Sequence, residues 1–163
     1  MASELRVDKI VPTTGVPTGG GGGIVQCVST TKTDPFNTDS TSYTDVTGLS
    51  ATITPTSDTS KIFVLVTACG NTNGSKGYGQ IVRDSTAIAI GDADGSKVRA
   101  TFDMNNGGSG NRGQSYVGQI LDSPGTTNAV TYKLQVRHEN GSGDVLSLIH
   151  ISEPTRRYAI GGS

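Results

Sequence analysis

The stretch KIFVLVTAC, Lys61 to Cys69, decides the fold class of this chain. It is rich in β-branched and aromatic residues and shows no helical periodicity, so it predicts a β-strand. Side chains of a strand alternate between its two faces. One face carries Ile62, Val64, Val66 and Ala68, and the other carries Phe63, Leu65 and Cys69. Both faces are apolar and need burial, whereas an antiparallel strand with one face in water alternates apolar and polar residues.

Two arrangements would bury both faces of this strand. One face fills the core of the domain, and the other is covered either by a neighbouring subunit or by a loop of the same chain. We favour a homo-oligomer, because a chain of 163 residues with an apolar fraction of 33% gains from burial shared between subunits. The apolar run is too short to span a bilayer, so no membrane insertion is expected.

Further strand-like segments lie on both sides of this stretch. In chain order they are 24–30, 42–54 (two short strands hinged at Gly48), a hairpin of 77–84 and 86–92, and then 98–104, 115–122 and 130–139. Asn-Gly pairs, including Asn140–Gly141, mark turns between them. Regular short strands separated by turns predict an all-β fold, an antiparallel β-sandwich or jelly roll, over residues 24–145.

The first 23 residues have a different composition. A charged leader, MASELRVDKI, is followed by VPTTGVPTGGGGG, in which Pro and a glycine run block regular structure. Residues 1–23 are therefore interpreted as an attachment arm with a flexible linker, or else as a frayed terminus. The leader has no apolar core, so no signal peptide is expected, and a chain made in the cytosol keeps Cys27 and Cys69 reduced.

The segment LSLIHISEPTR, residues 146–156, differs abruptly from the Thr-, Ser- and Gly-rich sequence before it. It resembles, residue for residue, the translation of a transposase sequencing adapter. On this interpretation residues 146–163 are not native, the natural protein continues differently after about Val145, and its closing strand or strands are absent. An unfilled sheet edge would be the structural consequence.

No catalytic, cofactor or metal site emerges from the motifs. His138, Glu139, His150 and Glu153 supply zinc-ligand chemistry, but neighbours on a strand point to opposite faces and the last two fall in the adapter-like tail. If that tail is encoded, the site becomes a candidate again. Asp92 and Asp94 resemble part of a calcium loop that lacks its distal Glu. Cys27 and Cys69 lie in apolar runs and are predicted to be buried free thiols.

Binding positions are expected on loops held by the strands. The candidate contact residues are Asn71, Asn73, Lys76, Asn105, Asn106, Asn111 and Arg112. The formal net charge of −1 gives no electrostatic attraction for nucleic acid. Several aspartates (Asp84, Asp92, Asp94, Asp103 and Asp122) are available for acid–base chemistry, but nothing in the sequence brings two of them together.

Three stretches resemble bacteriophage virion proteins of the tail-fibre type found in marine phages. They are MASELRVDKIVPTTGVPTGGGGGIVQ (1–26), TSYTDVTGLSATITPTSDTSKIFVLV (41–66) and VTYKLQVRHENGSG (130–143). The resemblance implies a jelly-roll head, trimeric like the tumour necrosis factor type, that is made in the host cytoplasm and mounted on the virion by the arm. It implies attachment to a host-surface glycan or protein. The alternatives are a capsid decoration or other purely structural virion component and, with less support, a glycan-active tail enzyme.

Overall fold

The structure is a computed structural model of the chain. It describes residue 24 and residues 26–72, 75–105, 113–142 and 145. The expected arm and linker, apart from their junction with the head, and the adapter-like tail therefore lie outside the described residues. No helix in the described part of the chain is long and apolar enough to cross a membrane.

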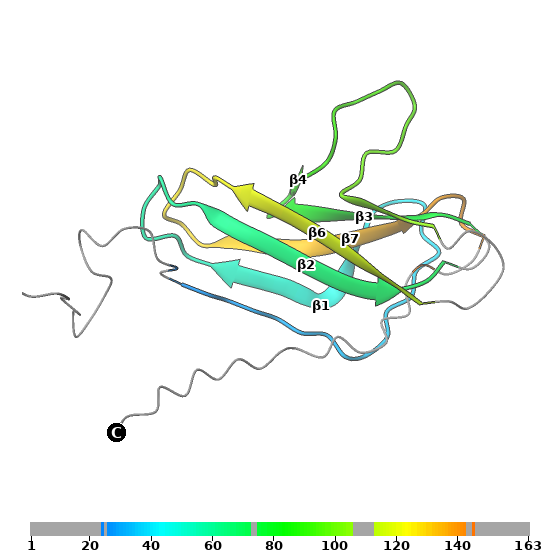
Figure 1. The fold of residues 1–163 in the computed structure, drawn as a ribbon, viewed down its shortest axis with the longest axis horizontal. Helices are drawn as coiled ribbons and strands as arrows, with labels where there is room; N and C mark the ends of the chain where they lie inside the picture. The colour runs from blue at the N-terminus through cyan, green and yellow to red at the C-terminus, as the bar shows by residue number, and fades with distance from the viewer. Residues whose placement is uncertain (1–23, 25, 73–74, 106–112, 143–144, 146–163) are drawn as a thin grey trace, which may run out of the picture.

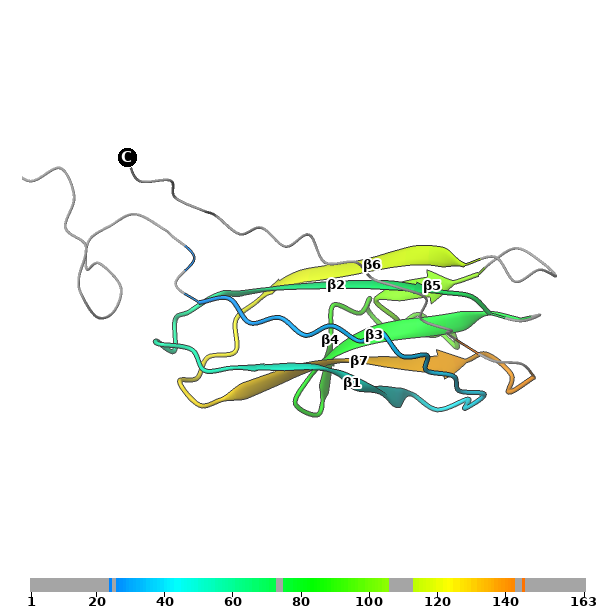
Figure 2. The same cartoon turned by 90° about the horizontal axis from the view of Figure 1, so that it is seen from below.

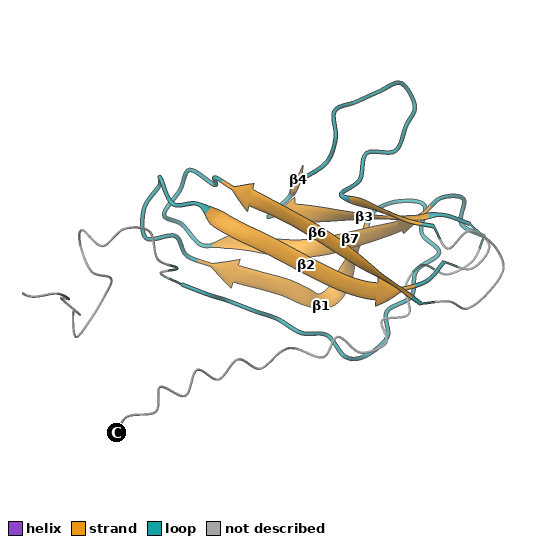
Figure 3. Cartoon of the chain, viewed as in Figure 1, coloured by secondary structure: helices purple, strands orange, loops and turns teal. Residues whose placement is uncertain are grey.

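Within the described residues the secondary structure is all β, with antiparallel pairing throughout (Figures 1 and 3). The strands are β1 (Thr44–Ile53), β2 (Ile62–Gly70), β3 (Gly77–Arg83), β4 (Thr86–Ile88), β5 (Phe102–Met104), β6 (Gln114–Asp122) and β7 (Val130–His138). The sequence predicted this fold class. It also predicted the strong strand at β2 and the hairpin β3–β4, whose turn places Asp84 at φ +53°.

The strands form two sheets. The five-stranded sheet has the order β1-β7-β3-β4, and β5 shares the free edge of β3 with β4, pairing at Gly77–Gly79 while β4 pairs at Ile81–Arg83. The two-stranded sheet contains β2 and β6, paired from Ile62–Asp122 to Gly70–Gln114. Figure 2 shows the two sheets as separate layers that face each other.

The core lies between the layers because each strand turns alternate side chains inward. In β7 the residues Val130, Tyr132, Leu134, Val136 and His138 are buried, and the residues between them are partly exposed. From the two-stranded sheet, Ala68 and Tyr116 reach the same cluster. Phe102 stacks on Tyr116 with ring centroids 5.7 Å apart, which joins β5 to β6.

The predicted hinge at Gly48 is a local irregularity within one strand. Gly48 has a φ of +84°, a conformation that favours glycine, and the register of β1 against β7 shifts between Asp45 and Ser50. The chain therefore keeps one strand where two were expected, because both halves pair with the same partner, β7.

The predicted strand at 24–30 is wrong for the described residues of that range, none of which belongs to a strand. They run extended along one side of the two layers (Figures 1 and 2). A strand needs a continuous ladder of backbone partners, and the contact found here is a single long hydrogen bond from the Thr30 hydroxyl to the Gly48 carbonyl at 3.4 Å.

Candidate functional site

The outer side of the two-stranded sheet is apolar and exposed. We call Phe63, Leu65, Val117 and Leu121 the apolar outer face. Their exposed fractions are 61%, 58%, 56% and 62%. Phe63 pairs across the strands with Leu121, and Val117 pairs with Thr67, so the four side chains share one face of β2 and β6.

This face is the second side of the strand that the sequence predicted to need burial. The inward side of β2 packs toward the core, but no described loop buries the outward side. Single exposed apolar residues are ordinary, whereas a contiguous patch on one sheet face is typical of an interaction surface. Of the two coverings that the sequence left open, a loop of the same chain is therefore not found among the described residues.

The predicted contact loops meet at one end of the layers. Gly70 pairs with Gln114, and Gly77 pairs with Met104. The strand ends that flank the loops 71–76 and 105–113 therefore lie at the same end of the two layers. Asn71 and Lys76 are half-buried and Asn105 is exposed. The remaining predicted positions, Asn73, Asn106, Asn111 and Arg112, lie outside the described residues.

Glu139 ties one of these loops to the end of β7. Its backbone N–H donates to the Lys76 carbonyl at 2.8 Å. Its carboxylate accepts hydrogen bonds from the Ser75 hydroxyl at 3.1 Å and the Tyr78 hydroxyl at 3.4 Å. The bond from Ser75 is the main cause that lowers the pKa of Glu139 below its ordinary value. The carboxylate is therefore held ionised at the rim.

A second cluster at this end was not predicted from sequence. The Arg137 guanidinium lies over the rings of Tyr43 and Tyr78, 5.8 Å and 5.9 Å from their centroids. The Tyr43 hydroxyl donates to the Arg99 carbonyl at 2.7 Å. Partial burial raises the pKa of both tyrosines. The cluster therefore joins β7 and β3 to the segment before β1, and the hydrogen bond of Tyr43 ties that segment to the loop containing Arg99.

Asp122, one of the aspartates that could serve acid–base chemistry, is held in structural contacts. The Asp122 carboxylate accepts from Arg83 Nη1 at 2.9 Å and from the Tyr132 hydroxyl at 2.6 Å, in a mostly buried network. Tyr132 itself is buried. Among the described residues, no three His, Cys, Asp or Glu side chains are grouped so that they could hold a metal ion.

His138 is buried and makes hydrogen bonds to the turn that follows β7. Its side chain is fully buried, and its Nδ1 accepts backbone hydrogen bonds from Asn140 at 3.3 Å and Gly141 at 2.9 Å. Since Nδ1 is an acceptor, the ring proton is assigned to Nε2. Glu139 points to the surface, as the strand alternation predicted. His150 and Glu153 lie outside the described residues.

The prediction that both cysteines are buried is wrong for Cys27, which is exposed, while Cys69 is half-buried. Cys27 is exposed because its segment forms no strand within a layer, so its apolar pattern finds no sheet to pack in. Sequence alone could not show this, since the run IVQCVST has an ordinary strand composition.

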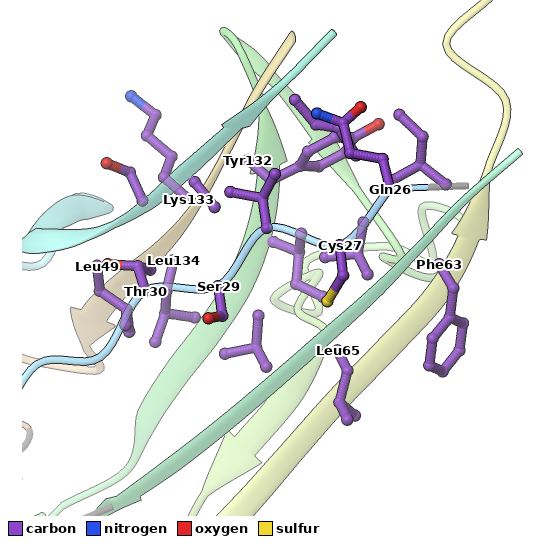
Figure 4. Close-up of a pocket in the computed structure, with 18 of the residues that line it drawn as sticks. Gln26, Cys27, Ser29, Thr30, Leu49, Phe63, Leu65, Tyr132, Lys133 and Leu134 are labelled. Carbon is purple, nitrogen blue, oxygen red and sulfur yellow. The ribbon is translucent and has the colours of Figure 1, made fainter. Parts of the chain in front are cut away.

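A groove lies between β2 and the extended segment 26–32, and we call it the β2 groove (Figure 4). Its volume is about 750 Å³. One wall is β2, which contributes residues of both its sides, Phe63 and Leu65 of the apolar outer face included. The other wall includes Cys27 and Ser29, and the floor includes Leu49, Tyr132 and Leu134 of the five-stranded sheet. Figure 4 shows the segment with Cys27 running beside β2 along this space.

No protein-family profile matches the chain, and no curated protein matches it significantly.

Proposed function

We propose that this chain is a structural protein of a bacteriophage particle, of tail-fibre type, whose β head forms a homo-oligomer and contacts the host surface. The resemblance of the leader, the central strands and the late strand to phage fibre proteins supports the class of protein. On this proposal the head is a jelly-roll β-sandwich, the arm 1–23 attaches it to the virion, and the assembly is a trimer.

The observation that carries the proposal is the apolar outer face. Four large apolar side chains that are each more than half exposed lie together on two paired strands. Covering them in an assembly removes apolar surface from water, which is the dominant favourable term in association. A fibre head needs such an interface, because several copies must share one attachment point.

The loop end is the part of the head proposed to meet the host. Asn71, Lys76 and Asn105 lie there, on loops anchored by β2, β3 and β5. Polar residues on loops that a rigid scaffold positions are suited to contact a glycan or a protein. The Arg137 cluster and Glu139 brace this end, which reduces the ordering cost of binding.

Sedimentation of the full chain tests the assembly. We expect one species of three times the chain mass of 16.8 kDa, and a monomer for Leu65→Asp, because a carboxylate in the interface is desolvated without a partner. Val98→Asp is the matched control, since Val98 is an exposed apolar residue on a loop away from this face. A monomeric parent chain at micromolar concentration contradicts the proposal.

Antibody labelling of particles and a cell-binding assay test the location and the role. Label at the tail, with binding of the head to host cells, supports attachment. Label distributed over the capsid, with no binding to cells, indicates instead a decoration protein. Release of sugar from host-surface polysaccharide would replace both with an enzyme.

A further inference from the structure

Val145 lies between the two segments that contain Thr38 and Thr72. It forms antiparallel bridges with both Thr38 and Thr72, and its backbone exchanges hydrogen bonds with Thr38 at 2.9 Å and 3.3 Å. Thr38 follows the extended segment 26–32, and Thr72 follows β2. A residue with a bridge on each side occupies the position of an inner strand in a sheet.

The burial of the Val145 side chain shows that this residue points into the core. Val145 and Thr72 are both fully buried, and a Cβ added to Gly77 would lie 3.0 Å from the methyl groups of Val145. Val145 therefore points into the core, and the chain is packed tightly at this point. In a strand that continues from here, residues at even spacing from Val145 also point inward.

The β2 groove lies along β2 from Thr67 back to Ile62, beyond the point where Val145 bridges Thr72. It separates β2 from the segment 26–32 and lies over the inward residues of β1 and β7. Within the described residues β2 pairs with β6 and with no other strand, so its second edge faces the groove. An unpaired edge beside an apolar groove is a template for an added strand.

Burial along β2 changes with distance from Val145. The inward residues Ala68 and Gly70 are buried, whereas Ile62, Val64 and Val66 are only half-buried. Burial changes in the same way along β1 of the other sheet, where Leu49 is buried and Ile53 is half-buried. Facing them, Val130, Tyr132 and Leu134 of β7 are buried over the same length. The inward residues of β2 that are distant from Val145 are therefore incompletely covered on the groove side.

We propose that the β2 groove is the seat of a strand formed by the chain that directly follows Val145. The strand runs antiparallel to β2 and, by the register of Val145 with Thr72, places residue 149 opposite Ala68, 151 opposite Val66 and 153 opposite Val64. It joins the segment 26–32 to β2 and converts the two-stranded layer into a larger sheet. This inference does not rest on the proposed function.

The residues that follow Val145 fit this seat in part. Of the positions that the register directs inward, 147 is the polar Ser147, opposite Gly70, whereas 149 and 151 are Ile149 and Ile151. Position 153 is Glu153 and is followed by Pro154. A carboxylate directed into the core and a residue without a backbone N–H both oppose a central strand. We expect a native continuation of the chain to carry an apolar residue at 153.

Amide hydrogen exchange of the full chain tests the seat. Ile149→Asp is expected to accelerate exchange of the groove-side amides between Val66 and Gly70 by about tenfold, because the inward charge expels the strand. The matched control, His150→Asp, changes the neighbouring outward position and is expected to leave this exchange unaltered. Equal exchange in the two variants and the parent chain overturns the proposal.

A second variant extends the test to the far half of the groove. Glu153→Val combined with Pro154→Thr is expected to slow exchange of the groove-side amides between Ile62 and Leu65 by about tenfold. No slowing overturns the register. Protection that rises with protein concentration indicates a strand donated by a second copy and overturns seating within one chain. A monomeric parent chain would contradict the oligomeric head and leave these outcomes unchanged.

Discussion

Arg83 of β3 and Asp122 of β6 form an ion pair across the two layers, with Nη1 of the arginine 2.9 Å from both carboxylate oxygens. The Tyr132 hydroxyl, from β7, donates to the same carboxylate at 2.6 Å. Burial and this hydrogen bond to a carboxylate raise the pKa of Tyr132 well above its ordinary value, so its proton stays in place. The network therefore links strands of both sheets through one acidic side chain.

Removing Asp122 is expected to destabilise the fold. Asp122→Ala leaves the partly buried Arg83 without its partner and should lower the free energy of unfolding by about 3 kcal/mol. Tyr132→Phe removes one hydrogen bond to the carboxylate and should cost about 1.5 kcal/mol. Urea unfolding measures both changes. Asp92→Ala, at an exposed loop position, is the control, and an equal loss there would show that the ion pair does not stabilise the fold.

Gly79 is expected to tolerate no side chain. A Cβ at this position would overlap the ring of Phe102, which already stacks on Tyr116. Gly79→Ala should therefore lower stability by about 1–3 kcal/mol through overpacking. Gly91→Ala is the comparison, because a Cβ there meets nothing within 4 Å. Urea midpoints that fall together for both variants would contradict the close packing of β3 against β5.

Asp45 gives the stability a defined dependence on pH. Hydrogen bonds from Lys133 at 2.7 Å and Gln135 at 2.6 Å, in that order of effect, lower its pKa below the ordinary value of 3.8. A lowered folded-state pKa contributes stability above 3.8 that is lost as pH falls through the folded value. Asp45→Asn should therefore be less stable than the parent chain at pH 7, and thermal melting should show that difference shrink below 3.8. A difference that grows in acid contradicts the assignment.

The adapter-like tail can be checked on the source DNA. A long read across codon 145 is expected to show a reading frame that leaves LSLIHISEPTR and continues into new strand-like sequence. Neighbouring genes for phage tail components would then support the proposed class of protein. If the read instead encodes LSLIHISEPTR, the adapter interpretation fails, and His138, His150 and Glu153 become residues to test for metal binding.

The sequence predicted the parts of the fold that local pattern controls. The unbroken apolar run of β2 and the strand-like segment 130–139 each predicted a strand at nearly the observed bounds. The same pattern predicted that the outward side of β2 is apolar and needs a cover, and the described residues leave that side exposed. The strand expected at 24–30 failed because strand formation needs a partner edge, and composition carries no information about whether that edge is filled.

The sites were harder to predict than the strands. Tyr43, Tyr78 and Arg137 come together only through the order β1-β7-β3, which no local spacing encodes. The same holds for Arg83, Asp122 and Tyr132, which face one another across the layers. Pairing between strands far apart in the sequence brings both clusters together. A single sequence therefore shows which residue types are present but not which of them lie in contact.

The position of β7 determines when the five-stranded sheet can form during synthesis. This strand pairs with β1 on one side and β3 on the other, yet among the described strands of the sheet it is the last to be translated. Nascent β1 and β3 therefore leave the ribosome without their shared partner and expose open edges until residue 138 has emerged. Such dependence on distant pairing slows folding and prolongs the interval in which chains on one polysome can associate wrongly.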